Sequence, residues 1–161
     1  MRPDAVAILL HRQCLQKMFF LQYLSYVFAD KGIGGVAFDK ESRKLLFWKK
    51  DKIGVVDFAR VEEENGLLKK SPEPRWLSTN ANDISSCFWV LKGSYIIFYD
   101  KAGVYLLEAQ SYAKPQCAFV TQAKRDSPVF YAEDTGMLYY LEAKTGKLTS
   151  LEIIPKSPAS R

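Results

Sequence analysis

An internal repeat limits the fold of this chain more than any other feature of its sequence. Three segments share one layout: residues 35–59 (GVAFDKESRKLLFWKKDKIGVVDFA), residues 86–109 (SCFWVLKGSYIIFYDKAGVYLLEA) and residues 128–153 (PVFYAEDTGMLYYLEAKTGKLTSLEI). Each predicts a short aromatic strand, a polar turn, a longer apolar strand, a second turn and a third strand. Because self-similarity at a regular spacing is typical of repeat architectures, we expect the chain to stack one structural unit several times.

Two rows of aromatic residues support this alignment of the three segments. The first row is Phe38, Trp89 and Tyr131, and the second row is Phe47, Phe98 and Tyr140. In both rows the first step is 51 residues and the second step is 42. The longer step includes residues 60–75, whose charges, glycine and prolines predict a surface loop. Offsets that agree on two strands of each unit indicate a repeat rather than independent hairpins.

A further strand-like stretch precedes each segment. These stretches are LQYLSYVFA at 21–29, RWLST at 75–79 and QCAFVTQ at 116–122. Four strands per unit, at a spacing of about 40–50 residues, are typical of β-propeller blades. We therefore predict an all-β fold of about three consecutive four-stranded antiparallel blades. Their expected bounds are residues 20–59, 75–110 and 116–154.

The central stretches KLLFW, YIIFY and MLYYL are apolar at nearly every position. A sheet with one solvated face alternates apolar and polar residues with period two. In a propeller each blade lies between two neighbours, so its inner strands are covered on both faces. A two-sheet sandwich would also cover such strands, but it does not account for the recurring four-strand unit.

Glycines mark most of the predicted hairpin turns. The turns LKGS, DKAG, EDTG and AKTG each place a glycine where a tight connection needs a positive φ angle. The corresponding turn of the first segment, DKESRK, lacks a glycine. We expect that turn to be longer or looser.

Three blades are fewer than the roughly 4–8 blades of known closed propellers. A terminal repeat exposes an apolar face unless a cap covers it. Three arrangements stay open: the chain is the C-terminal part of a larger propeller, two copies complete one ring, or residues 1–19 cap an open end. The polar tail over residues 155–161, which we expect to be disordered, favours the first arrangement.

Residues 1–28 are rich in apolar side chains but contain no long unbroken apolar run. A signal peptide needs about 7–15 consecutive apolar residues and a membrane helix about 20. His11, Arg12 and Lys17 interrupt the stretch. We predict a short helix within residues 1–19, no signal peptide and no transmembrane helix. The compartment stays open, with the cell envelope considered if the chain is a fragment.

The formal charge of +5 permits attraction to nucleic acid, yet the lysines are scattered along predicted turns and edges. The best stacking platforms for single strands are Trp48 beside Lys49 and Lys50, and Trp76 beside Arg75. Aromatic residues within apolar strands are more often part of a core. We therefore expect a protein or peptide partner and find no strong nucleic-acid signal, while binding of nucleic acid through a basic patch stays open as a third, weaker alternative.

Cys14, Cys87 and Cys117 and the single histidine, His11, do not form a metal-binding pattern. A zinc site needs about four ligands, usually in closely spaced pairs. Free cysteine in an apolar run behaves as a small hydrophobic residue. A disulfide between Cys87 and Cys117 stays open as an alternative. We predict no metal site and no cofactor.

No constellation typical of catalysis is evident. His11 lies outside the predicted blades, and no G-x-S-x-G motif supplies an activated serine. The sequence GIGG at 32–35 lacks the lysine and the helix of a phosphate loop. The acidic residues Glu62–Glu64, and Glu133 with Asp134, predict solvated loops rather than glycosidase carboxylates. We predict that the chain is not an enzyme and has no catalytic residues.

The second segment resembles a blade of the TolB-like and dipeptidyl-peptidase-like β-propellers. Trp89, the turn with Gly93 and the stretch YIIFYDKAGVYLLEA carry the resemblance, and Glu108 occupies the acidic position that ends such blades. Asp57 matches that position in the first segment, and Glu152 matches it more loosely in the third. The pattern is similar also to the propeller repeats of bacterial envelope proteins with PEGA domains. The usual Ser-Pro-Asp-Gly turn is replaced by VLKG.

The resemblance implies a binding or scaffolding function. A propeller presents loops at its faces to a protein, peptide or glycan partner, and this inference rests on the fold alone. The alternative implied function is an accessory domain of a hydrolase whose catalytic part lies elsewhere.

We expect the substitution Trp89→Ala to lower the free energy of unfolding by about 3–5 kcal/mol, as a truncation in the core. Denaturant unfolding followed by circular dichroism measures this change. A decrease below about 1 kcal/mol would place Trp89 on the surface and favour a recognition role for it.

Overall fold

The computed structural model describes residues 32–41, 43–58, 63–64, 67–68, 74–77, 81–110 and 115–153. The chain divides into two compact units, Met1–Ile33 and Gly34–Arg161, and every described strand belongs to the second. The predicted helix within residues 1–19, the stretch at 21–29 and the tail at 155–161 lie outside the described residues.

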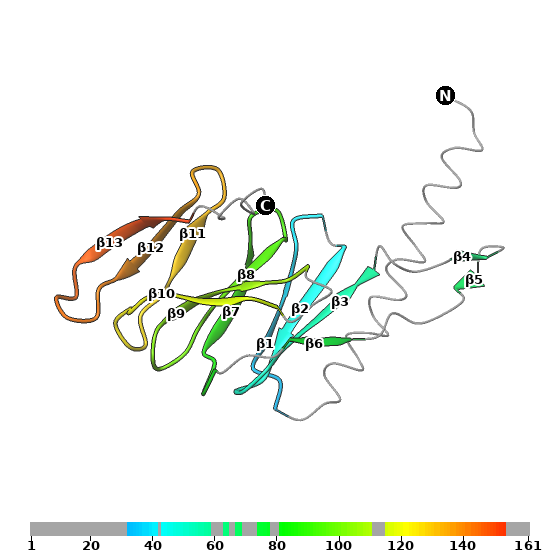
Figure 1. Ribbon diagram of the computed structural model, residues 1–161, viewed down its shortest axis with the longest axis horizontal. Coiled ribbons are helices and arrows are strands. Elements are labelled where there is room, and N and C mark those ends of the chain that lie inside the picture. The colour runs from blue at the N-terminus through cyan, green and yellow to red at the C-terminus, as the bar shows by residue number, and fades with distance from the viewer. Residues whose placement is uncertain are drawn as a thin grey trace, which may run out of the picture. The chain divides into compact units, whose positions relative to one another are not determined.

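Three antiparallel sheets follow one another along the chain (Figure 1). The first sheet contains β1 (Gly35–Phe38), β2 (Lys44–Trp48), β3 (Ile53–Asp57) and β6 (Arg75–Leu77). The second contains β7 (Ser86–Val90), β8 (Tyr95–Tyr99), β9 (Val104–Glu108) and β10 (Cys117–Thr121). The third contains β11 (Phe130–Ala132), β12 (Met137–Leu141) and β13 (Leu148–Glu152). A separate two-stranded sheet pairs β4 (Glu63–Glu64) with β5 (Leu67–Leu68).

The prediction of an all-β fold with about three consecutive antiparallel blades is confirmed. The described residues contain no α-helix, and none of their segments has the length and apolar character of a membrane-spanning helix.

The sequence repeat reappears in the strand pairing. Phe47, Phe98 and Tyr140 are the fourth residues of the central strands β2, β8 and β12. The first aromatic row also keeps its partners from sheet to sheet: Phe38 pairs with Leu45, Trp89 with Ile96, and Tyr131 with Leu138. Residues at equal offsets therefore occupy equivalent places in the three sheets, which the two aromatic rows predicted.

The fourth strand of each sheet differs from the sequence-based grouping. RWLST and QCAFVTQ were expected to begin the second and third units, but β6 pairs with β3 and β10 pairs with β9. Each therefore completes the sheet before it. The physical reason is that a short strand pairs with whichever free sheet edge lies beside it. For β6 that edge is β3, and the pairing buries Leu77 in the first core cluster, where it is 2% exposed. The described part of the third sheet has three strands.

The core between the sheets forms two clusters. The first core cluster joins the first and second sheets and contains Leu46, Trp48, Ile53, Val55, Leu77, Ile84, Cys87, Ile96, Phe98, Leu107 and Ala109. The second core cluster joins the second and third sheets and contains Val90, Ile97, Val104, Leu138, Tyr140 and Ile153. Successive residues of a strand point to opposite faces, so β8 contributes to both clusters. The two-sided burial expected of YIIFY is thus observed.

Polar contacts join the hairpin turns of neighbouring sheets. The Lys44 ammonium donates a hydrogen bond to the carbonyl of Gly93 at 2.9 Å, and the indole of Trp89 donates to the carbonyl of Ala37 at 3.3 Å. On the other side, the backbone N–H of Lys92 donates to the carboxylate of Glu133 at 2.6 Å. The turn after β7 is therefore held from both neighbouring sheets.

Two glycine turns show different physical reasons for glycine. Gly93 has a φ angle of 73°, as the sequence predicted for the turn LKGS. Gly103 in DKAG is needed for a close approach instead, because a Cβ atom there would lie 2.6 Å from both the Phe119 ring and the carbonyl oxygen of Thr121.

Gly54 provides a test of packing in the first sheet. A Cβ atom at this position would lie 2.2 Å from the ring of Phe47, which also contacts Trp76 edge to face. We expect Gly54→Ala to destabilise the fold by about 1–3 kcal/mol through overpacking. Phe47→Leu removes the ring atoms that clash, so the double variant should be less destabilised than the sum of the two singles. If the loss of stability in the double variant equals the sum of the losses in Gly54→Ala and Phe47→Leu, the contact between position 54 and the Phe47 ring is contradicted.

Candidate functional site

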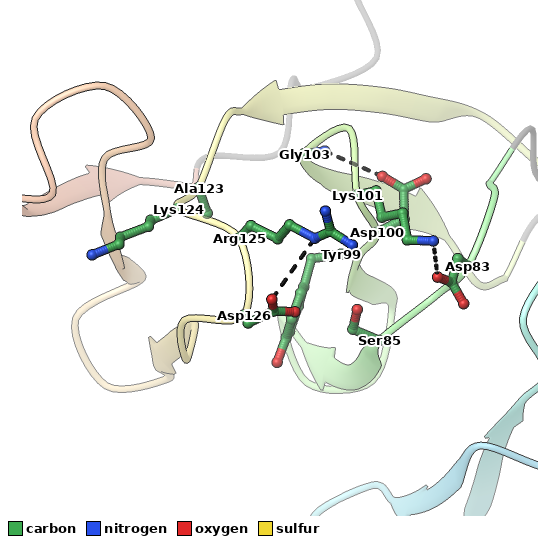
Figure 2. A pocket seen from close by; sticks show the side chains of 10 residues that line it. All are labelled: Asp83, Ser85, Tyr99, Asp100, Lys101, Gly103, Ala123, Lys124, Arg125 and Asp126. Carbon is green, nitrogen blue, oxygen red and sulfur yellow. Dashed lines mark hydrogen bonds and ion pairs between the residues drawn. The ribbon is translucent and has the colours of Figure 1, made fainter.

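A polar pocket of about 100 Å³ lies at one end of the second sheet (Figure 2). Three segments form it: the residues that lead into β7, the turn between β8 and β9, and the connection from β10 to β11. Its lining residues are Asp83, Ser85, Tyr99, Asp100, Lys101, Gly103, Ala123, Lys124, Arg125 and Asp126.

The carboxylate of Asp100 accepts hydrogen bonds from backbone N–H groups on two sides of the pocket. One carboxylate oxygen accepts hydrogen bonds from the N–H groups of Ala102 at 2.8 Å and Gly103 at 3.2 Å. The other oxygen accepts from the N–H of Asn82 at 3.2 Å. Aspartate favours such turns because its short side chain reaches the backbone two residues on. The carboxylate of Asp100 therefore joins the turn to the segment before β7.

Asp83 is paired with two cations. Its carboxylate forms an ion pair with Lys101, and the Lys50 ammonium lies 3.5 Å away. The hydrogen bond and the positive charge of Lys101 lower the pKa of Asp83 below its ordinary value, and Lys50 adds to the effect. Asp83 is thus ionised and charge-compensated at neutral pH.

Arg125 retains most of its hydrogen-bonding capacity. Its Nε atom lies 3.7 Å from a carboxylate oxygen of Asp126, and both side chains are largely exposed. In Figure 2 the guanidinium lies among the lining residues, whereas the side chain of Lys124 points away from them. Buried Ser127 fixes this segment, because its hydroxyl donates to the carbonyl of Lys124 at 2.6 Å. The N–H of Lys124 in turn donates to the carbonyl of Leu141 in the third sheet at 2.7 Å.

The pocket has the composition of a site for an anionic group. Two of its three carboxylates are engaged by backbone N–H groups or by lysines, while the planar guanidinium of Arg125 has donors to spare. The hydroxyls of Ser85 and Tyr99 add two further polar groups to the lining. A guanidinium binds a carboxylate through two parallel hydrogen bonds, which gives both strength and orientation.

The described residues contain no cluster of histidine, cysteine, aspartate or glutamate that could hold a metal ion. The pocket therefore offers binding groups rather than metal ligands within the part of the chain that the structure describes.

The two tryptophans predicted as stacking platforms differ in solvent exposure. Trp48 is 7% exposed and belongs to the first core cluster, so it offers no stacking surface. Trp76 is 40% exposed, and the ammonium groups of Lys52 and Lys49 lie 4.4 Å and 5.8 Å from its ring centroid. Arg75 donates to the carbonyl of Ala109. The structure does not bring the two tryptophans together into one surface.

The other sequence candidates are dispersed. In GIGG at 32–35, Gly35 packs against the indole of Trp48, since a Cβ atom there would lie 2.3 Å from the ring. Glu133 and Asp134 are exposed, and Glu133 accepts a hydrogen bond from a backbone N–H. His11 and the side chains of Glu62–Glu64 lie outside the described part of the chain.

Both described cysteines are free thiols, so the structure contains no Cys87–Cys117 disulfide. Cys87 is buried in the first core cluster, as predicted, and burial raises the pKa of its thiol. Cys117 is exposed on the outer strand β10, where it was expected to be in a core.

The amino-acid sequence does not reveal the pocket. Its residues come from three loops that together span 43 positions of the chain, from Asp83 to Asp126. The turn DKAG and the segment KRDS were visible as polar loops, but no spacing rule joins them. Only the pairing of β8 with β9 and of β9 with β10 brings them to one end of the sheet.

No protein-family model matches the sequence, and no curated protein matches it. Among solved structures, the chain is similar to the crystal structure of a putative 6-phosphogluconolactonase from Bacteroides fragilis, with 14% identity and a TM-score of 0.37. The match covers 73% of this chain and 37% of that protein. The chain thus spans little more than a third of the length of the structure that it matches.

The prediction that the chain is not an enzyme is corrected by this comparison, because the similar structure is described as that of an enzyme. The similarity is too distant to carry an activity over to this chain. The alternative of an accessory domain of a hydrolase stays a prediction.

We expect Lys101→Met to raise the pKa of Asp83 toward the ordinary value of an aspartate, because the substitution removes the main cause of its lowering. NMR titration of the side-chain carboxyl carbon measures it. Since folding lowers this pKa, the ion pair stabilises the fold above the ordinary pKa, and the contribution is lost as the pH falls through the lowered value. Exposed Lys144, replaced in the same way, is the control and should leave Asp83 unchanged. An unaltered titration in Lys101→Met would show that Lys101 does not act on Asp83.

Proposed function

We propose that this chain is a propeller-type interaction module that binds an acidic segment of a protein or peptide partner at the loop end of its second sheet. The observation that carries the proposal is Arg125, whose guanidinium lies in a pocket where Asp83 and Asp100 are already neutralised or hydrogen-bonded. A carboxylate of the partner would complete the hydrogen bonding of that guanidinium.

The size of the pocket favours one side chain of a larger partner. Ligand sites for small molecules usually measure about 300–1,000 Å³, whereas this pocket holds about 100 Å³. A single glutamate or aspartate side chain, or a chain terminus, fits such a volume. Contacts outside the pocket would then supply most of the affinity, as in protein interfaces with a central anchor.

Charge supports an acidic partner. The chain carries a formal charge of +5, and exposed Arg125 lies in the pocket, where Lys101 pairs with Asp83. An excess of one charge attracts partners of the opposite sign and raises their rate of association. The two engaged carboxylates limit the repulsion that an incoming anion would meet.

The positions of three acidic residues are consistent with the resemblance to the TolB-like and dipeptidyl-peptidase-like propellers. Asp57, Glu108 and Glu152 each end the third strand of their sheet. Each also pairs with the first residue of the central strand, namely Lys44, Tyr95 and Met137. The acidic residues that carry the resemblance thus occupy one repeated place, which supports a common blade pattern.

The proposal predicts binding of a labelled peptide that alternates glutamate and serine, measured by fluorescence anisotropy. Arg125→Ala should weaken this binding by a factor of roughly 10–150, since a hydrogen bond to a charged group contributes roughly 1.5–3 kcal/mol. Arg125→Lys should recover only part of the affinity, because an ammonium cannot form the bidentate pair.

Two controls define the result. Lys144→Ala removes an equal charge outside the pocket and should leave the affinity nearly unchanged. A peptide with glutamine in place of glutamate should bind weakly to every variant. Equal binding of the glutamate and glutamine peptides, or equal loss in Arg125→Ala and Lys144→Ala, would reduce the effect to net charge and overturn the proposed site.

A further inference from the structure

Strand β10 forms an edge of the second sheet, in which the strands follow the order β10-β9-β8-β7. Cys117, Ala118 and Phe119 of this strand are exposed to solvent, and the exposed fraction of Phe119 is 57%. An edge strand presents N–H and C=O groups that can pair with another extended chain. Because these residues are exposed, such a chain can reach β10.

The pairing of β10 with β9 determines which backbone groups point outward. The N–H of Glu108 donates to the carbonyl of Gln116 at 2.9 Å. In an antiparallel pair of strands, hydrogen-bonded residue pairs alternate with pairs that are not hydrogen-bonded. Counting from Gln116 in the observed register, Ala118 bonds to β9, whereas Cys117 and Phe119 do not. The N–H and C=O groups of Cys117 and Phe119 therefore point away from β9, along what is here called the outer edge.

The outer edge ends near the polar pocket. The register of β10 shifts between Phe119 and Thr121, and a bulge of this kind interrupts regular pairing. Two residues after Thr121, Ala123 forms a β-bridge with Glu142 of the third sheet. The chain is thus held in place directly after the outer edge, where it begins to line the pocket.

Phe119 presents an aromatic ring beside the outer edge. The ring lies edge to face on Tyr105, with 5.5 Å between the centroids, and Tyr105 stacks on Phe98 at 5.0 Å. Phe98 is 1% exposed and belongs to the first core cluster. The exposed ring is therefore supported by rings that reach into the core. It offers apolar area to a partner with little loss of side-chain freedom.

Gly103 connects this ring to the pocket. The residue lines the pocket, and a Cβ atom on it would lie 2.6 Å from the Phe119 ring. The ring consequently lies against a wall of the pocket that Arg125 also lines. A partner segment that fills the pocket passes close to Phe119.

We propose that the acidic partner binds as an extended strand along the outer edge, with an apolar residue opposite Phe119 and an acidic residue in the pocket. This inference rests on the proposed function and adds the conformation and the second anchor of the partner. In strand addition, main-chain hydrogen bonds give affinity and alternate side chains give specificity.

Strand geometry places both anchors on one side of the partner. A residue that pairs with Phe119 has its side chain on the same face of the sheet, beside the ring. The side chain two positions further along lies on that face too, about 7 Å away. We expect this second side chain to pass Gly103 and to carry the carboxylate that Arg125 binds.

Fluorescence anisotropy with the labelled peptide Ser-Glu-Ser-Phe-Ser-Glu-Ser tests the apolar anchor. The glutamates on both sides of the phenylalanine make the probe suitable for either strand direction. It should bind about three- to tenfold more tightly than the peptide with a central serine, which has the same charge, because its ring is partly buried on Phe119. Phe119→Ala should remove this preference. Phe130→Ala is the matched control, since Phe130 is an exposed aromatic residue of the third sheet, and should retain it.

Methylation of the peptide backbone tests the strand pairing. N-methylation of the central phenylalanine removes the N–H that donates to the carbonyl of Phe119. It should weaken binding about two- to tenfold, the usual contribution of one hydrogen bond. N-methylation of a neighbouring serine, whose N–H points away from β10, is the control and should have little effect.

The outcomes separate this inference from the proposed function. Equal affinity for the phenylalanine and serine peptides, a preference that survives Phe119→Ala, or equal effects of the two methylations would overturn the strand. The pocket is tested by Arg125→Ala and by glutamine in place of both glutamates. If these changes weaken binding but phenylalanine gives no preference, the pocket is supported and the strand is rejected. If the phenylalanine and methylation effects persist without dependence on Arg125 or glutamate, the strand is supported and the pocket is rejected.

Discussion

The burial of β8 on both faces is the constraint on which the described structure depends. Ile96 and Phe98 pack against the first sheet, and Ile97 packs against the third, so a single five-residue strand belongs to both core clusters. Neither cluster can form unless the sheets stack in order. Because apolar burial is the main favourable term in folding, the stack is stabilised as a whole rather than sheet by sheet. This requirement explains why β8 has almost no polar residue: neither of its faces is in contact with solvent.

Two-sided burial leaves the ends of the sheets as the places for polar chemistry. The hairpin turn at Gly93 is held by Lys44 on one side and, through Lys92, by Glu133 on the other. At the pocket, backbone hydrogen bonds and lysines satisfy Asp83 and Asp100, and Arg125 keeps donors beyond its contact with Asp126. Loops that a rigid stack holds in place are where binding residues are usually found.

The repeat allowed much of the fold to be predicted, because offsets of 51 and 42 residues place Phe47, Phe98 and Tyr140 at one position of three central strands. The fourth strands could not be assigned in this way. RWL and CAFVT follow one sheet and precede the next along the chain, and only the hydrogen-bonded edge decides between them. Gly103 was expected to serve a turn with positive φ, but it makes room for Phe119. The prediction for Cys117 failed because its strand lies at a sheet edge, where an apolar run is not covered on both sides.

The sequence by itself determined the type and order of the strands in the three main sheets, the repeated unit and the two-sided burial of the central strands, whereas β4 and β5 lie in a stretch predicted as a loop. These properties are local, since side-chain periodicity and turn residues act within a few positions of the chain. The tertiary structure decided which edge each outer strand joins, that Asp83, Asp100 and Arg125 line one pocket, and that Leu148 is exposed where Val104 is buried. Those outcomes depend on which segments meet in space, and equivalent positions of a repeat acquire different surroundings in different sheets.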